Sequence, residues 1–460
     1  MATCVALCHG HHREKGGRAA SRRRAVGLPA RVSRGAALAA VLLVAPACQD
    51  AGPGGGAGDL QVLDSAGIEI VRDARTARPL GITEVLRVGV VEGDPAYQFD
   101  RIRTVTVEPG GAFWVVDRHP ALRRYDAEGR HVAEGGGQGQ GPGEAEIYLA
   151  ALATSEGVVA FGIPQSFQWF GPDGAFRDSR RAVTDDGGSL QLLGRAGERL
   201  VFSRMRFPPG SGGHSIETGG APHVRASTEL YTAPGILEDL RTVATFPGDL
   251  FTGQGGAGPF VLGRTSFAVD DPGRIYVSDT LAYRVQVHDL EGRLIRVIER
   301  PLSPVPIAEE FADQVREGVE AAFREGIPGV IEPGLDAQRR DQVERISTAA
   351  VPPRLPPHFP FIDRILVSPE GTLWVERADR HPRPALRAVA HAFGYIHYAW
   401  HASWRAPRVF DLFDSEGRYA GTVELPFGFT PMEPSGDRIF GALTDELGVE
   451  QVVAFQVEGL

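Results

Sequence analysis

The sequence predicts an all-β fold, a six-bladed β-propeller built from four-stranded antiparallel blades. Three observations lead to this prediction. The chain contains 58 Gly and 34 Pro among 460 residues and is 42% hydrophobic, which is typical of a globular protein with many turns. A unit of four short strands recurs at a spacing of roughly 40 residues. Each clear copy carries a glycine turn before its last strand, as a series of hairpins requires.

The repeated unit is clearest in two segments, which begin at Ile102 and Ser266. In both, a strand and a Gly turn are followed by a strand ending in an acid, a third strand, an Asp-x-x-Gly turn and a fourth strand. The Asp of that turn can bond its own downstream backbone, and Gly tolerates the positive φ that follows. The two turn glycines are 18 residues apart in one copy and 19 in the other, from Gly111 to Gly129 and from Gly273 to Gly292. Further copies carry their turns at Gly174 and Gly417.

Counting these units predicts six blades, of which the last shows three strands. We expect its outer strand to be Thr83–Gly89. The segment that follows this strand, residues 89–102, leads into blade one in the same way as the Gly-rich segment 137–148 leads into blade two. This N-terminal strand would close the ring and remove its open sheet edges. The predicted blades span residues 101–135, 145–180, 188–247, 262–300, 361–424 and 427–458.

Two insertions interrupt the repeat. Residues 307–349 lie between blades four and five and are predicted to be helical, because four large apolar residues are spaced by four. These residues are Phe311, Val315, Val319 and Phe323. The second insertion, residues 380–405, is rich in His, Tyr and Trp.

The segment from Asp279 to Ile298 resembles the NHL repeat, which has an Asp, an Asn-Arg pair, a strand and an Asp-x-x-Gly turn. Asp279, Arg284, Asp289 and Gly292 match that pattern, and Tyr283 stands where Asn is common. Residues 63–458 are also similar to bacterial six-bladed propeller lipoproteins, a family of mostly unknown function. That resemblance is carried by a Gly-rich loop at 137–144 and a Leu-Trp-Val strand at 373–375, and it implies the fold without implying an activity.

The N-terminus predicts export. Residues 36–47 form an apolar run too short to span a bilayer, preceded by arginines, which is typical of a signal peptide. Small residues precede Cys48 as in a bacterial lipobox, and plain secretion is the alternative. We therefore predict a signal peptide at 1–47, a lipidated Cys48 with a flexible tether at 48–62 and the propeller at 63–460. The product would be an exported cell-envelope lipoprotein, anchored in the inner or outer membrane on its periplasmic or surface side.

Composition excludes several kinds of chemistry. The three cysteines are Cys4, Cys8 and Cys48, so the predicted mature domain has no disulfide. The single lysine is Lys15, which excludes Schiff-base and phosphate-loop lysines after cleavage. Removal of residues 1–47 would take away eight Lys or Arg and one acid and shift the formal charge from −10 to −17. A nucleic-acid partner is therefore not expected.

Candidate ligand-binding residues lie where the inner strands begin, at the mouth of the predicted channel. Two blades begin alike, with Asp-Arg pairs before an isoleucine, and two other charged residues fall at similar positions. Such a ring could coordinate a cation or bind a carboxylate or phosphate ligand, and the alternative is a set of structural bridges between blades. The candidates are Asp100, Arg101, Glu144, Arg264, Asp363 and Arg364.

The second insertion contains candidate metal ligands. His397 and His401 would share a helical face at a spacing that can hold zinc, although the glutamate of the zincin motif is absent. An aromatic cap or a partner-binding loop is the alternative interpretation. The Gly-rich run 135–143 lacks the Lys-Ser/Thr of a phosphate loop and is interpreted as a crossover between blades.

The leading functional hypothesis is a non-catalytic propeller, anchored at the bacterial cell envelope, that binds an unknown protein or a small polar ligand. Its membrane contact would be the lipid anchor. Some six-bladed relatives are metal-dependent hydrolases, lactonases or lyases, so a calcium-dependent enzyme acting at the central channel is one alternative. A carbohydrate-binding propeller that uses the aromatic insertion is another. The sequence identifies no cofactor, and the enzyme alternative implies calcium.

Overall fold

The computed structural model describes residues 60–207, 223–234, 237, 239–252, 265–279, 282–325, 333–350, 357–380, 407–445 and 447–460. Several predictions fall outside these ranges: the signal peptide 1–47, Cys48, Arg264, both metal candidates His397 and His401, and nearly all of the insertion 380–405. All described ranges lie in the unit Gly56–Leu460.

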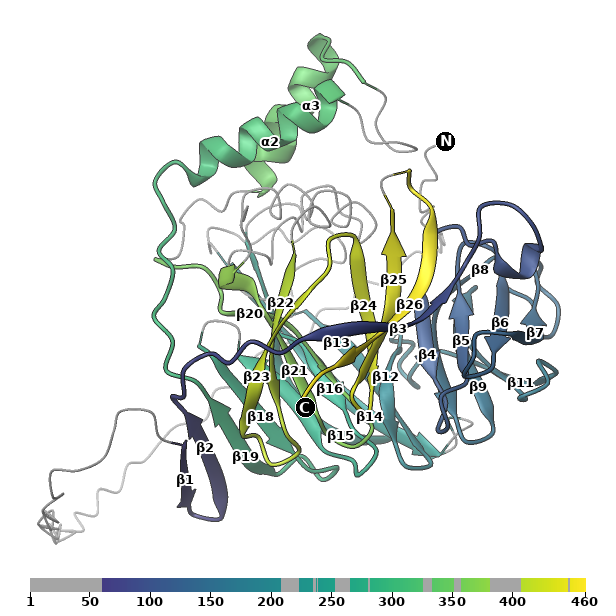
Figure 1. The fold of residues 1–460 in the computed structure, drawn as a ribbon, viewed down its shortest axis with the longest axis horizontal. Coiled ribbons are helices and arrows are strands. Elements are labelled where there is room, and N and C mark those ends of the chain that lie inside the picture. Colours follow the sequence, from purple (N-terminus) through teal and green to yellow (C-terminus); the bar gives the residue numbers. More distant parts are fainter. Residues whose placement is uncertain are drawn as a thin grey trace, which may run out of the picture. The chain divides into compact units, whose positions relative to one another are not determined.

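Six β-sheets, one for each blade, form a β-propeller as the sequence predicts (Figure 1). In every blade the strands that follow one another along the chain pair in antiparallel register, and the first strand is innermost. Blade one consists of β4 (Thr104–Val107), β5 (Phe113–Val116), β6 (Ala121–Tyr125) and β7 (His131–Gly136). Blade two consists of β8 (Ile147–Thr154), β9 (Gly157–Ile163), β10 (Ser166–Phe170) and β11 (Phe176–Arg181). Blade three consists of β12 (Gln191–Ala196), β13 (Arg199–Arg206), β14 (His223–Pro234) and β15 (Arg241–Thr252).

The second half of the ring follows the same order. Blade four consists of β16 (Phe267–Val269), β17 (Ile275–Asp279), β18 (Arg284–His288) and β19 (Leu294–Glu299). Blade five consists of β20 (Ile362–Val367), β21 (Leu373–Arg377), β22 (Arg408–Phe413) and β23 (Tyr419–Leu425). Blade six consists of β24 (Phe429–Ser435), β25 (Arg438–Thr444) and β26 (Glu450–Val457), with β3 (Ile82–Val88) as its outer strand.

The N-terminal strand β3 closes the ring, since it pairs antiparallel with β26 from the C-terminus. The pairing runs from Val88 opposite Val452 to Ile82 opposite Val457, which places the strand within one residue of the expected Thr83–Gly89. Val88 is buried in the core between blades six and one, beside Val452 and Phe440. Hydrophobic side chains thus hold the first and last parts of the chain together.

The repeated turns contain the hydrogen bonds from Asp to backbone that the sequence predicts. In the turn between β18 and β19, Asp289 Oδ1 accepts hydrogen bonds from the backbone N–H groups of Glu291 and Arg293 at 3.1 and 2.8 Å. The turns at Asp126 and Asp414 have the same bonds. Because each Asp satisfies two backbone donors within its own turn, a few adjacent residues are enough to encode the turn.

In four blades, the glycine of the turn before the last strand also packs against the outer strand of the preceding blade. A Cβ atom at Gly174 in blade two would overlap the carbonyl oxygen of Glu134 on β7 in blade one. The turn glycines of blades one, four and five meet β3, β15 and β19 in the same way; they are Gly129, Gly292 and Gly417. Glycine therefore lets successive blades approach closely at this position of the repeat.

An N-terminal hairpin that the sequence did not predict extends blade four. Strands β1 (Leu60–Ser65) and β2 (Ile68–Asp73) pair with each other, and β2 lies parallel to β19 at the edge of the blade (Figure 1). Strand β1 begins inside the segment 48–62 that was predicted to be a tether. The chain then crosses blade five, where Leu80 N–H donates to Thr422 O at 2.8 Å, before it enters β3.

The predicted helical insertion contains α2 (Phe311–Glu325) and α3 (Ala337–Ala350), between β19 and β20. The four apolar residues spaced by four, Phe311, Val315, Val319 and Phe323, are all buried, and the Phe311 ring contacts Phe359. Two short 3-10 helices, η1 (Pro95–Tyr97) and η2 (Ala378–Arg380), complete the described elements. Among the described residues, no helix is long and apolar enough to cross a membrane.

Candidate functional site

The predicted Asp-Arg pair of blade one lies just before the inner strand β4. Asp100 contacts two exposed arginines, Arg101 at 3.9 Å and Arg118 at 3.4 Å. Nearby, Glu450 is buried and accepts the N–H of Ile102 at 2.6 Å. Burial raises the pKa of Glu450 to about 7, with a further contribution from Asp100. This mouth therefore combines two acids with exposed arginines.

The second Asp-Arg pair lies on β20 of blade five. Arg364 Nε donates to Glu376 on β21 at 2.7 Å, and its Nη2 donates to the carbonyl of Pro431 in blade six at 3.0 Å. These contacts match the structural bridge that was the alternative interpretation. Glu144, in turn, accepts the N–H of Gly141 at 2.9 Å within the Gly-rich loop before β8. A ligand role for either residue remains a prediction.

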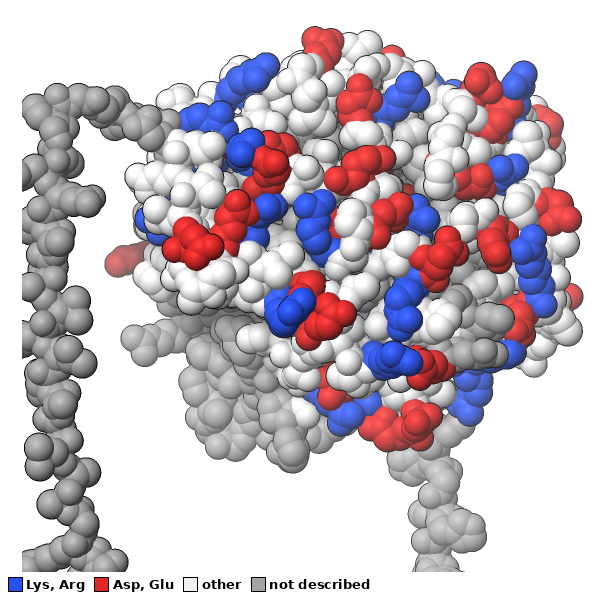
Figure 2. Space-filling view, turned by 90° about the horizontal axis from the view of Figure 1, so that it is seen from below, with Lys and Arg blue, Asp and Glu red and all other residues white. Residues whose placement is uncertain are grey.

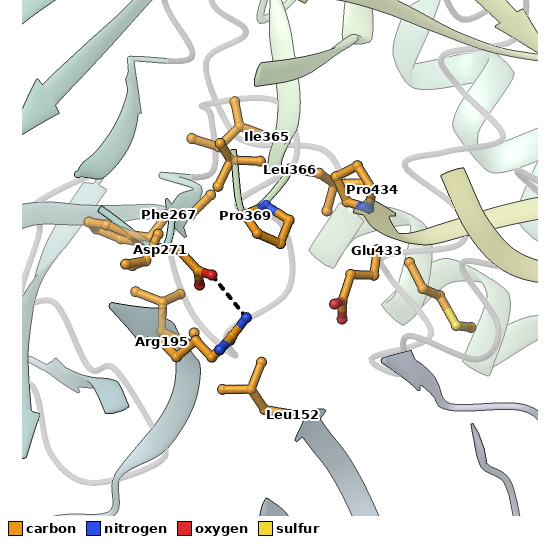
Figure 3. A pocket seen from close by; sticks show the side chains of 15 residues that line it. Leu152, Arg195, Phe267, Asp271, Ile365, Leu366, Pro369, Glu433 and Pro434 are labelled. Carbon is orange, nitrogen blue, oxygen red and sulfur yellow. Dashed lines mark hydrogen bonds and ion pairs between the residues drawn. The ribbon is translucent and has the colours of Figure 1, made fainter. Parts of the chain in front are cut away.

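A pocket of about 160 Å³ lies where the inner strands end. Of the described mouth residues, Asp100, Arg101 and Glu144 precede their inner strands, and Asp363 and Arg364 lie near the start of β20. Five blades contribute to its lining, and three charged side chains face into it (Figure 3). These are Arg195 at the end of β12, Asp271 in the turn after β16 and Glu433 near the end of β24. We call this site the channel pocket.

Arg195 and Asp271 form an ion pair across two blades. The distance from Arg195 Nη2 to Asp271 Oδ2 is 3.0 Å, and Asp271 also donates its backbone N–H to the carbonyl of Pro369 in blade five at 3.1 Å. Burial raises the pKa of Asp271, and the charge of Arg195 opposes that shift. Since blades three, four and five are joined through Asp271, its side chain is held in place in the absence of ligand.

Glu433 lies across the pocket from Arg195 (Figure 3). Its Oε1 accepts the N–H of Val107 at 3.1 Å, and the hydroxyl of Thr106 also bonds the carboxyl. The same hydroxyl accepts the N–H of Ala153 in blade two at 2.8 Å. Burial raises the pKa of Glu433 to about 7 despite these hydrogen bonds. The sixth inner strand, β4, thus takes part in the site by holding this carboxyl.

The rest of the channel pocket is apolar. Leu152, Phe267, Ile365 and Pro369 come from three different blades and surround the charged groups (Figure 3). Apolar walls with a few fixed polar groups are the usual composition of a small-molecule site, and drug-sized ligands need roughly 300–1,000 Å³. This pocket suits a smaller ligand.

Acidic and basic side chains are interspersed over the face of the molecule that Figure 2 shows. Arg195 also lines a second pocket of about 350 Å³, between blades two and three, together with Trp169 and Phe170. Among the described residues, no three His, Cys, Asp or Glu side chains are grouped closely enough to hold a metal ion.

Sequence reasoning missed the channel pocket because its three charged residues come from blades far apart along the chain. One signal was available for Asp271, which lies two residues after the end of an inner strand in a clear copy of the repeat. Its neighbour Asp270 points elsewhere, since it is fully buried and bonds Arg274 and Tyr276 within its own blade. Two adjacent aspartates could not be told apart from the sequence.

These features define the class of protein, a six-bladed β-propeller with a ligand-sized pocket at one end of its channel. No protein-family model matches the chain, and no curated protein resembles it closely enough to be matched.

Solved structures with a similar arrangement include a member of the DUF4221 family from Bacteroides vulgatus, at 10% identity and a TM-score of 0.48, covering 83% of this chain and 99% of that one. A protein of Bacteroides fragilis whose export is predicted has 10% identity and a TM-score of 0.44, covering 82% and 95%. Virginiamycin B lyase from Staphylococcus aureus has 9% identity and a TM-score of 0.38, covering 82% and 99%. Identities of this size extend no activity or ligand to this chain.

Proposed function

We propose that this chain is an exported, lipid-anchored propeller that binds a small polar ligand in the channel pocket without transforming it. The observation that supports binding is the convergence of Arg195, Asp271 and Glu433 from three blades between apolar walls. Contacts to neighbouring blades fix two of these groups, so little ordering would accompany binding. The absence of any lysine beyond Lys15 and of any cysteine beyond Cys48 narrows the nucleophiles on which a reaction could rely.

Binding is tested by filling the pocket. Leu152 lines it, whereas Leu149 on the same strand β8 is 37% exposed. We expect Leu152→Trp to abolish binding of small organic probes and Leu149→Trp to leave it unchanged. Three probes of equal length, n-butylammonium, butyrate and 1-butanol, would be titrated into the full chain and followed by ligand NMR, with dissociation constants on the order of millimolar for the probe that fits. Equal binding to both tryptophan variants, or no binding at all, would refute the proposal.

Anchoring is tested at the cysteine. If Cys48 carries the lipid, the full chain produced in a bacterial host should enter the detergent phase on phase separation, and Cys48→Ser should stay in the aqueous phase. Cys8→Ser is the matched control, because that residue lies inside the predicted signal peptide. Detergent partitioning that is unaffected by Cys48→Ser would exclude this anchor.

A further inference from the structure

The charges in the channel pocket do not balance. One base, Arg195, faces two acids, Asp271 and Glu433. Arg195 pairs with Asp271 at 3.0 Å, and within the described part of the chain no arginine forms an ion pair with Glu433. Its partners are the Thr106 hydroxyl and the Val107 N–H, both neutral donors. This half-buried carboxyl is hydrogen-bonded to neutral groups, and Arg195, whose charge acts on it, is already paired with Asp271.

We propose that the channel pocket takes a small organic cation, an ammonium group on a short apolar body, with Glu433 as its counter-charge. This inference rests on the proposed binding function and names its ligand class. The ammonium group would lie between Glu433 and Asp271, and the hydrocarbon body would contact Phe267, Ile365 and Leu152. Binding would then place a positive charge beside the Glu433 carboxylate.

Other ligand classes fit this pocket less well. An anion could approach Arg195, but it would meet Asp271, which already occupies that guanidinium, and the Glu433 carboxyl across the pocket. A metal ion usually needs several oxygen or nitrogen ligands, and here most of the lining is aliphatic or aromatic. An uncharged molecule would suit Glu433 only in its protonated form, so its binding should weaken as the pH rises above about 7. The formal charge of −10 on the whole chain also favours the approach of cations.

The pH dependence of the dissociation constant provides a readout that is specific to Glu433. Burial raises its pKa to about 7, the charge of Arg195 opposes the shift and that of Asp271 adds to it. A cation binds the ionised carboxylate, so affinity should rise with pH through this range and level off once Glu433 is fully ionised. Between pH 6 and pH 8 the ionised fraction of such a group grows about tenfold, and the dissociation constant should fall by about the same factor.

The experiment titrates n-butylammonium, butyrate and 1-butanol into the full chain at pH 6 and pH 8. We expect n-butylammonium to bind best and about tenfold more tightly at pH 8. Glu433→Gln keeps the shape of the side chain and should weaken that binding at least tenfold at pH 8 and remove its pH dependence. Glu424→Gln is the matched control, because Glu424 is exposed on the outer strand β23. Denaturant unfolding of each variant would establish that it is folded.

The outcomes separate the two proposals. Preferred binding of butyrate or 1-butanol, or binding of n-butylammonium that Glu433→Gln leaves unchanged, would overturn the cation inference while the ligand-binding function stands. Failure of all three probes to bind, or binding that Leu152→Trp does not affect, would overturn both.

Discussion

Replacing Asp411 with alanine is expected to lower the free energy of unfolding by about 4 kcal/mol, because it leaves buried guanidinium groups without their shared counter-charge. Asp411 on β22 is completely buried, and its Oδ2 accepts from Arg300 and Arg377, each at 3.1 Å. The Tyr283 hydroxyl donates to the same oxygen at 2.8 Å, and Thr422 donates to Oδ1 at 2.6 Å. Burial raises the pKa of Tyr283 well above its usual value, so this hydroxyl stays a donor.

The loss of stability should depend on which arginines are left without an acidic partner. Arg377 keeps a second acid, Asp379, at 2.5 Å, whereas Asp411 is the one acid with which Arg300 pairs among the described residues. The double variant Arg300→Met/Asp411→Ala should therefore be at least about 1 kcal/mol more stable than Asp411→Ala alone.

The matched control for Asp411 is Asp178→Asn, which breaks a surface pair with Arg180 and should change stability by less than about 0.5 kcal/mol. Denaturant unfolding of the full chain measures all three variants. A loss below about 1 kcal/mol for Asp411→Ala would contradict the importance of this buried network.

Much of the fold could be predicted because the repeat is local. The turn bonds of Asp289 and the positive φ of Gly292 depend on a few adjacent residues, so each blade leaves the same pattern in the sequence. The closing strand β3 could be predicted because the last blade showed only three strands in the sequence. The hairpin β1–β2 could not be predicted in this way, because blade four already has four strands of its own. The parallel contact of β2 with β19 also joins segments more than 200 residues apart in the chain.

The candidate site was less predictable. Glu433 becomes a pocket residue because blade one supplies Thr106 and Val107 to hold its carboxyl, and no local spacing encodes that contact. Arg364 shows the opposite case. Its position before the body of an inner strand suggested a ligand role, yet its guanidinium bonds Glu376 and the carbonyl of Pro431. Sequence position identifies which strand a residue occupies, and only the packing of the blades determines what it faces.

Gly174→Ala is expected to lower the free energy of unfolding by about 3 kcal/mol, in part because Gly174 contacts the neighbouring blade. The backbone of Gly174 has φ of +79°, which costs an L-residue roughly 1–2 kcal/mol. A methyl group there would also overlap the carbonyl oxygen of Glu134 in blade one, and forcing such a contact adds roughly 1–3 kcal/mol. The turn would have to move away from the preceding outer strand.

Gly187→Ala separates the two causes. Gly187 has a nearly identical φ of +81°, and a Cβ atom there would have no neighbour within 4 Å. This variant should lose only the roughly 1–2 kcal/mol of the backbone conformation. Denaturant unfolding of both variants in the full chain gives the difference, which we attribute to the packing of one blade's turn on its neighbour. Equal losses would mean that φ alone requires glycine at this turn, and close approach between blades would then not explain its place in the repeat.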